Sequence, residues 1–153
     1  MAVHNSFESL IKELKAIADA ALADEVAKEV KSVESKKVEQ TVYGAGLPTM
    51  YQRRGVGEGT QSLGDVSQMN HSVINGVLEV TNDAEAYYPD NANGGLNNDW
   101  SLAQNIEEGY AGRDTWYSEA RPFISDTIDE LARSNAHVEA MKRGLKKRGL
   151  GVV

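Results

Sequence analysis

Apolar residues recur at steps of three and four along the first part of the chain, which is the pattern of an amphipathic helix. The stripe consists of Phe7, Leu10, Ile11, Leu14, Ile17, Ala18, Ala21, Leu22, Val26, Val30 and Val33. Asn5 is a residue type that caps helices, and Glu8 stands three residues later in the capping-box position. The pattern predicts a helix over residues 5–36, about 45 Å long at 1.5 Å per residue. A helix of that length should lie along a sheet, bury its apolar stripe and extend past the sheet.

Residues 40–118 change in character and predict a small sheet with long loops. Thr41–Tyr43 and Met50–Arg53 contain β-formers and predict short strands. The clearest β signal is "SVINGVLEV", in which apolar residues flank Asn75 and Gly76. Asn-Gly favours the type I′ turn, whose twist suits a two-residue hairpin. We therefore expect a hairpin with about four or five residues in each strand.

Two polar stretches predict loops without a bound group. The stretch "GVGEGT" lacks the Gly-Lys-Ser/Thr of a phosphate loop and the spacing of a dinucleotide loop. The stretch "YYPDNANGGLNNDW" lacks the oxygen ligands of a calcium loop at Ala92 and Gly94. We expect both to be surface loops. The residues after Trp100 have helical spacing and predict a short helix that ends at Gly109.

The C-terminal part of the chain repeats the helical pattern over residues 122–148. Pro122 is favoured in the first turn of a helix, where its missing N–H costs nothing. Acidic residues come early and basic residues late, which suits the helix dipole at both ends. Asn135 interrupts the apolar stripe, so one bent helix and two consecutive helices are both consistent with it. The stripe consists of Phe123, Ile124, Ile128, Leu131, Val138, Met141 and Leu145.

Length and composition favour a single α+β domain over residues 1–153. Long N-terminal and C-terminal helices would pack on a small antiparallel sheet. Cysteine is absent, which excludes disulfides, thiolate catalysis and zinc-thiolate sites and favours synthesis in a reducing cytoplasm. The N-terminus does not look like a secretion signal, and no apolar run approaches the ~18 residues of a membrane span.

The residue patterns that carry catalysis or metal binding are missing. His4, His71 and His137 have no second ligand at helical spacing, so we expect no metal site. There is no nucleophile elbow. Glu107 and Glu108 are adjacent, so they do not face each other on a helix and should be solvated. These observations predict a protein that is not an enzyme and has no cofactor.

Three stretches resemble the tail-completion (head–tail joining, or neck) proteins of long-tailed bacteriophages. The N-terminal helix fits the opening of that family. Glu108-Gly109-Tyr110 and Ala120-Arg121-Pro122-Phe123-Ile124 occupy the places of its acidic-Gly turn and of its A/P-R-P-F motif before the last helix. "PTMYQRRGVGEG" with the hairpin, and "HVEAMKRGLKKRGL" near the end, resemble a branch from Gram-positive phages and prophages.

The resemblance implies a virion structural protein that forms a ring, most often a hexamer, around the axis between portal and tail tube. Its partners would be other copies of itself and the neighbouring head-completion, tail-terminator or tail-tube proteins, and DNA would pass through the lumen without specific binding. Gly55–Asn70 and Tyr88–Trp100 would be assembly loops, Arg121 would pair with an acid, and Phe123 would pack in the core. A tail-terminator ring, or a DNA-binding accessory protein that uses the basic C-terminus, are the alternatives.

The residues assigned to assembly or interaction are Arg53, Arg54, Gly57, Asn93, Trp100, Arg121, Lys146, Lys147 and Arg148. The residues assigned to structural anchoring are Asn75, Gly76, Pro122 and Phe123.

Overall fold

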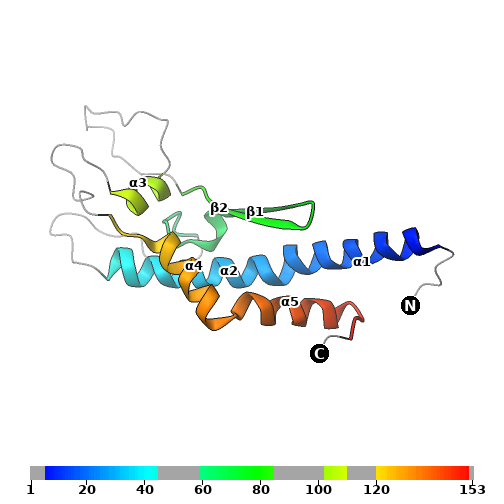
Figure 1. The fold of residues 1–153 in the computed structure, drawn as a ribbon. Coiled ribbons are helices and arrows are strands. Elements are labelled where there is room, and N and C mark those ends of the chain that lie inside the picture. Colours follow the sequence, from blue (N-terminus) through cyan, green and yellow to red (C-terminus); the bar gives the residue numbers. More distant parts are fainter. Residues whose placement is uncertain (1–5, 45–58, 85–101, 110–119, 152–153) are drawn as a thin grey trace.

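A long helical rod from residue 7 to residue 43 is the axis of the molecule, and the other elements lie along it (Figure 1). The computed structural model describes residues 6–44, 59–84, 102–109 and 120–151. The rod consists of α1 (Phe7–Ala21), η1 (Leu22–Val26), α2 (Ala27–Lys37) and η2 (Val38–Tyr43). The segments η1 and η2 are π-helical turns. A π turn inserts extra backbone into a helix and so rotates the side chains that follow relative to those before it.

Both ends of the rod differ from the predicted helix. Ser6 is the N-cap, and its side-chain oxygen accepts a hydrogen bond from the N–H of Ser9 at 3.2 Å. The predicted capping box is therefore wrong. The predicted end near Lys36 and the predicted strand Thr41–Tyr43 are also wrong, because this segment continues as a helix. Burial explains the continuation, since Val42 on the last turn is only 4% exposed and packs in the core.

The predicted hairpin is confirmed. Strands β1 (Met69–Ile74) and β2 (Val77–Asn82) pair antiparallel, with Ile74 opposite Val77. Asn75 and Gly76 have φ angles of 54° and 79°, as a type I′ turn requires. The hairpin lies alongside the rod, and its turn sits near Asp19, whose carboxylate oxygen is 4.0 Å from the position of a Cβ built on Gly76 (Figure 1).

The C-terminal part forms two helices, α4 (Phe123–Ser134) and α5 (Ala136–Lys147). Asn135 separates them and adopts the left-handed conformation with a φ of 53°. Of the two arrangements that the sequence left open, the chain therefore forms two consecutive helices and not one bent helix. Helix α4 crosses α2, and α5 lies alongside η1 (Figure 1). The sequence predicted that Pro122 is the first helical residue. In the structure Pro122 is the N-cap, and α4 begins one position later at Phe123. Helix α3 (Leu102–Glu108) is followed by Gly109 with a φ of 77°, as expected.

The core lies where the end of the rod, α3 and α4 meet. It consists of Val38, Val42, Leu63, Ala84, Ala103, Ile106 and Phe123. The described part of the expected loop Gly55–Asn70 contributes to this region, because Leu63 is 2% exposed and Asp65 is fully buried. Residues 62–65 of the expected assembly loop are thus buried within the chain, and its last two residues, Met69 and Asn70, belong to β1. The short helix η3 (Val66–Gln68) leads from this turn into β1. The α+β class is confirmed, with the hairpin and the C-terminal helices both packed on the rod.

The buried Asp65 explains why that turn is ordered. Its carboxylate accepts hydrogen bonds from the backbone N–H of Gln61 at 2.8 Å and of Ser67 at 2.9 Å. Burial alone would raise the pKa of Asp65, but the hydrogen bonds from Ser67 and Gln61 outweigh it and lower the pKa. The charged carboxylate thus binds the backbone on both sides of the turn, at Gln61 and at Ser67.

Candidate functional site

The Arg-Pro-Phe segment ties three parts of the chain together. The backbone N–H of Arg121 donates to the carbonyl oxygen of Ile106 at 2.8 Å, and its guanidinium donates to the carbonyl oxygen of Val42 at 3.1 Å. Phe123 is fully buried, as predicted. The expected pairing of Arg121 with an acid is wrong for the described residues, where its side chain binds a backbone carbonyl instead. Arg121 therefore joins the last turn of the rod to the start of α4.

Glu107 caps α4 from a different helix. Its carboxylate accepts hydrogen bonds from the backbone N–H of Ile124 at 2.7 Å and of Ser125 at 3.0 Å, and from the Ser125 hydroxyl at 2.7 Å. The first N–H groups of a helix lack partners within it, and a negative charge there is favourable. Pro122 supplies no side-chain cap of its own. The prediction of a solvated pair is therefore wrong for Glu107 and holds only for the exposed Glu108.

The basic C-terminal cluster is held against the rod. Lys147 binds Glu25 at 3.0 Å, and Arg148 binds the second oxygen of the same carboxylate at 2.7 Å. Arg148 also pairs with Asp24 and donates to the carbonyl oxygen of Ala20 at 3.0 Å. The hydrogen bonds from Arg148 and Lys147 lower the pKa of Glu25. Two of the three basic residues expected to bind partners are thus used within the molecule, and Lys146 remains exposed.

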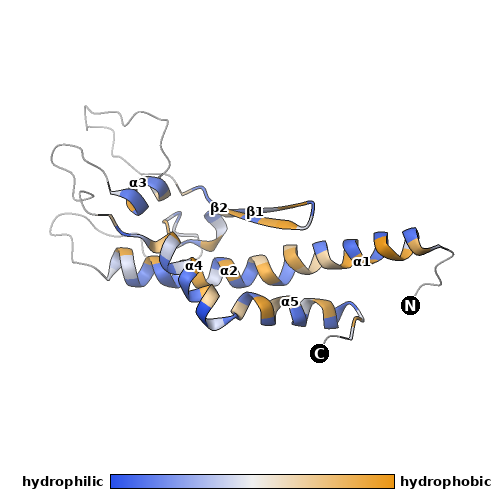
Figure 2. Ribbon diagram, in the orientation of Figure 1, coloured by the Kyte–Doolittle hydropathy of each residue, from blue (hydrophilic) through white to orange (hydrophobic). Residues whose placement is uncertain are grey.

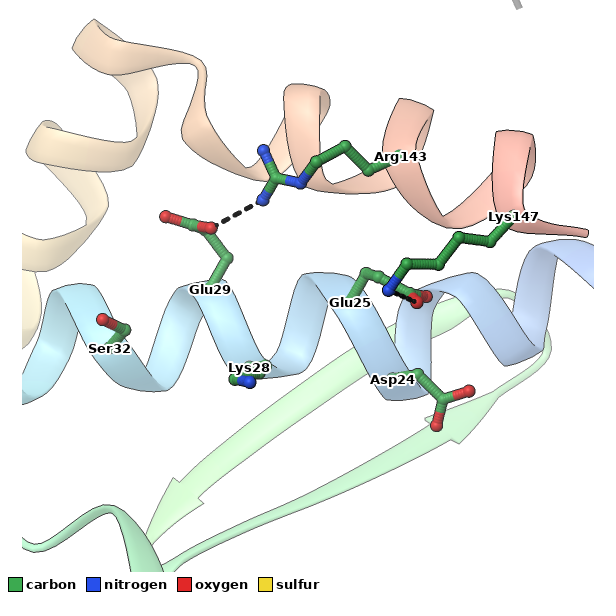
Figure 3. A pocket seen from close by; sticks show the side chains of 7 residues that line it. All are labelled: Asp24, Glu25, Lys28, Glu29, Ser32, Arg143 and Lys147. Carbon is green, nitrogen blue, oxygen red and sulfur yellow. Dashed lines mark hydrogen bonds and ion pairs between the residues drawn. The ribbon is translucent and has the colours of Figure 1, made fainter. Parts of the chain in front are cut away.

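A polar groove of about 470 Å³ runs between the rod and α5 (Figure 3). Its lining residues are Asp24, Glu25, Lys28, Glu29, Ser32, Arg143 and Lys147. Arg143 reaches across and binds Glu29 at 2.9 Å. Three acids and three bases line the groove, and Arg143–Glu29 and Lys147–Glu25 pair across it, so it has no surplus charge to attract one class of ion. The arrangement holds α5 to the rod, and across the described parts of the chain no cluster of His, Asp and Glu fits a metal ion.

Gly144 permits the close approach of α5 to the rod. A Cβ built on Gly144 would lie 2.8 Å from the Cβ and 3.2 Å from the Cα of Ala21. It would also lie 2.8 Å from a carboxylate oxygen of Glu25. The sequence held one signal of this contact, because a glycine inside a helix costs about 1 kcal/mol relative to alanine and needs a reason such as packing.

The first two turns of α1 expose large apolar side chains. Phe7 is 75% exposed, and Leu10, Ile11 and Leu14 are 36%, 38% and 40% exposed. We call these four residues the α1 ridge. Figure 2 shows that α1 carries hydrophobic positions in the part that runs beyond the hairpin and α5. The predicted burial of the whole stripe is therefore wrong for these four residues, which lie closer to the N-terminus than Asp19, the residue beside the hairpin turn.

The other residues assigned to assembly lie outside the described residues. These are Arg53, Arg54, Gly57, Asn93 and Trp100, together with the predicted strand Met50–Arg53 and the expected loop Tyr88–Trp100. The structure brings Arg121, Lys147 and Arg148 against the rod at two separate places, and each holds a C-terminal helix there.

Comparison with known proteins identifies the family to which the chain belongs. Neither the curated proteins nor the solved structures compared with the chain gave a match. None of the described helices combines the length and the apolar character that crossing a membrane requires. The model of one protein family, YomN, matches residues 6–147, which is nearly the whole chain. The chain therefore belongs to the YomN family, a phage-derived family.

Proposed function

We propose that the protein is a non-enzymatic structural component of the phage virion. It forms a ring at the head–tail junction and joins a completed tail to a DNA-filled head. Its partners are further copies of the same chain, most simply six in a ring, and the neck and tail proteins above and below. DNA passes through the lumen without specific binding. The family match supports a phage protein, and the virion and neck roles are proposed from the motifs that resemble tail-completion proteins.

The observation that carries the proposal is the junction of α3 and α4. The two motifs that resemble tail-completion proteins, around Gly109 and around Pro122, come together there. Glu107 caps α4, Arg121 binds Ile106 and the rod, and Phe123 fills the core. The motif residues Arg121 and Phe123, and Glu107 just before the first motif, thus have structural tasks, and fixed surfaces of this kind are what a ring subunit presents to its neighbours.

Two alternatives belong beside this proposal. A tail-terminator ring would use the same kind of subunit at the end of the tail tube. A DNA-binding accessory protein would need free positive charge, and the structure gives little support for it, since Arg143, Lys147 and Arg148 are paired with acids of the rod. The formal net charge of −7 also opposes general attraction to phosphate.

Electron microscopy of particles made without this gene tests the proposal. We expect DNA-filled heads beside separate tails of normal length. Tails of uncontrolled length would point to a terminator instead. Normal particles would remove the neck assignment. Salt-dependent binding of duplex DNA that is lost in Lys146→Glu would then favour the accessory role, because this substitution leaves the ion pairs of Lys147 and Arg148 in place.

A further inference from the structure

We infer that α5 is an exchangeable arm, which binds either the rod of its own chain or the rod of a second copy. In the exchanged form the break at Asn135 straightens, and α4 and α5 become one continuous helix. The partner is therefore a second copy of this chain, and the surface that it offers is the one that α5 already covers in the structure. The inference goes beyond the proposed neck role and does not depend on it.

The packing of α5 lets it separate from the rest of the molecule. Among the described elements, α5 has its main contacts with the rod, through α1, η1 and α2, and it lies outside the core. Its buried residues, Ala140 and Gly144, are small, and Gly144 lies against Ala21 of the rod. Met141 and Leu145 are half-buried. The arm can therefore leave the rod without opening the core or exposing a large, fully buried side chain.

Charge complementarity makes the contact specific for the rod of this chain, in the same copy or in another. Arg143 binds Glu29 at 2.9 Å. Lys147 and Arg148 bind the two oxygens of Glu25 at 3.0 and 2.7 Å. Figure 3 shows two of these pairs spanning the space between α5 and the rod. The same pairs form when α5 comes from a second copy, so the exchange needs no new interface.

The break between α4 and α5 is a single exposed residue. Asn135 has a φ of 53°, a conformation that is unfavourable for residues with a Cβ, although asparagine tolerates it better than most. The N–H of Ala136 donates to the Ser134 hydroxyl at 3.3 Å, a long hydrogen bond, whereas in a continuous helix it would donate to the carbonyl oxygen of Ala132. A short hinge under strain favours exchange between copies.

The sequence on both sides of Asn135 suits one helix. Leu131 and Val138 are seven residues apart, which is close to two helical turns, and residues 123–143 contain neither glycine nor proline. Residues 123–147 would form a helix about 37 Å long at 1.5 Å per residue. Helix α4 crosses α2, whereas α5 lies along the rod (Figure 1). A helix that continued in the direction of α4 would therefore carry α5 away from its own rod.

Concentration decides between the two forms. The hinge keeps α5 at a high effective concentration beside its own rod, so the closed form prevails in dilute solution. Copies that are held side by side raise the local concentration of neighbouring rods, and the exchanged form then competes. The exchange closes either as a reciprocal pair or around a ring, because both remake every contact of α5.

Substitution of the hinge residue tests the inference. Asn135→Gly eases the left-handed conformation and should keep the chain monomeric, whereas Asn135→Ala disfavours it and favours the continuous helix. Analytical ultracentrifugation of both full-length variants measures the dissociation constant of the oligomer. We expect this constant to be about tenfold lower for Asn135→Ala, given the cost of the left-handed conformation. Equal constants, or two variants that stay monomeric up to about 1 mM, would overturn the exchange.

Charge reversal identifies the surfaces that the copies exchange. One variant reverses the rod, by Glu25→Lys with Glu29→Lys, and the other reverses α5, by Arg143→Glu with Lys147→Glu. In either variant alone, α5 meets like charge on its own rod and on every other copy. In an equal mixture, the α5 of each chain meets opposite charge on the rod of the other. We expect native mass spectrometry to show a one-to-one complex in the mixture and none in either variant alone.

The matched control separates exchange from general attraction between chains of different net charge. Glu79→Lys with Glu108→Lys makes the same change in net charge at exposed positions away from the rod. Mixed with the variant reversed in α5, it should give no complex. A complex of equal abundance in the two mixtures, or its absence from both, would overturn the exchange. Neither result would affect the neck role, which the gene-deletion particles test independently.

Discussion

The two ends of the helical rod differ in what surrounds them. At the η2 end, Val38 and Val42 are 0% and 4% exposed and are enclosed by α3, α4 and the turn at Leu63. At the α1 end, Phe7 is 75% exposed, although it belongs to the same apolar stripe as the buried Val26 and Val33. The comparison teaches that periodicity identifies the side of a helix that is able to be buried. What covers that side is decided by other parts of the fold or by another molecule.

The largest expected effect is at the enclosed end. Phe123→Ala removes a fully buried aromatic ring and should lower the free energy of unfolding by about 3–5 kcal/mol. Chemical denaturation followed by circular dichroism measures it. An unchanged midpoint would show that the Arg-Pro-Phe segment does not anchor the core, and the contrast between the two ends would then fail.

Gly144→Val tests the contact that sets how far α5 covers the rod. The new side chain would meet Ala21 and Glu25 at distances that require α5 to shift. We expect a loss of about 1–3 kcal/mol in the free energy of unfolding, typical of overpacking. Gly151→Val is the control, because nothing lies within 4 Å of a Cβ there and φ is not positive, so it tests neither crowding nor backbone strain. An equal loss in both variants would contradict close packing as the reason for Gly144.

Glu107→Ala removes the cap that α3 supplies to α4. Two backbone N–H groups and the Ser125 hydroxyl lose their acceptor, so stability should fall by about 0.5–2 kcal/mol, as for other N-cap losses. Glu108→Ala, which changes the exposed neighbour, is the matched control and should have little effect. Equal melting temperatures for the two variants would mean that the cap contributes nothing.

The pH dependence of stability tests the buried carboxyl group of Glu34, which lies on the rod near the hairpin. Glu34 is 7% exposed and accepts a hydrogen bond from the side-chain amide of Asn82 at 2.8 Å. Burial raises the pKa of Glu34, the Asn82 hydrogen bond and Lys31 oppose the rise, and Glu107 adds to it. The folded state therefore holds this proton more tightly than the unfolded state, and the ionised form reduces stability as pH rises through the folded pKa.

Glu34→Gln keeps an acceptor for Asn82 and removes the charge. We expect it to raise the melting temperature at pH 7 and to lose this advantage as pH falls below about 4, near the ordinary pKa of glutamate. The exposed Glu79→Gln on the hairpin is the control. A variant that is less stable at pH 7 would show that the charge of Glu34 is favourable where it lies.

The smallest effect on the isolated chain is expected at the α1 end. Leu14→Ala on the α1 ridge should change the free energy of unfolding of the monomer by no more than about 1 kcal/mol, because the side chain is 40% exposed and little packing is lost. A large loss of monomer stability would mean that the ridge is covered within the chain.

The sequence by itself determined the elements whose signals are local. The Asn75-Gly76 turn, the end of α3 at Gly109 and the helical pattern after Pro122 depend on backbone conformations that particular residue types favour, so short stretches sufficed. The Arg121-Pro122-Phe123 motif is also a local signal, and the fold gives Arg121 and Phe123 structural tasks. Local signals do not specify partners far along the chain.

Only the tertiary structure decided the pairings across that distance. The sequence suggested that Glu107 is solvated, but α4 lies beside α3 and Glu107 caps it. The sequence also suggested that Lys147 and Arg148 are available to a partner, but both bind Glu25 of the rod. Thr41–Tyr43 is short enough to suit a strand or a helix, and packing around Val42 selected the helix. The physical reason is the same in each case, since burial and ion pairing depend on which surfaces meet, and a helix stripe records only that a surface is apolar.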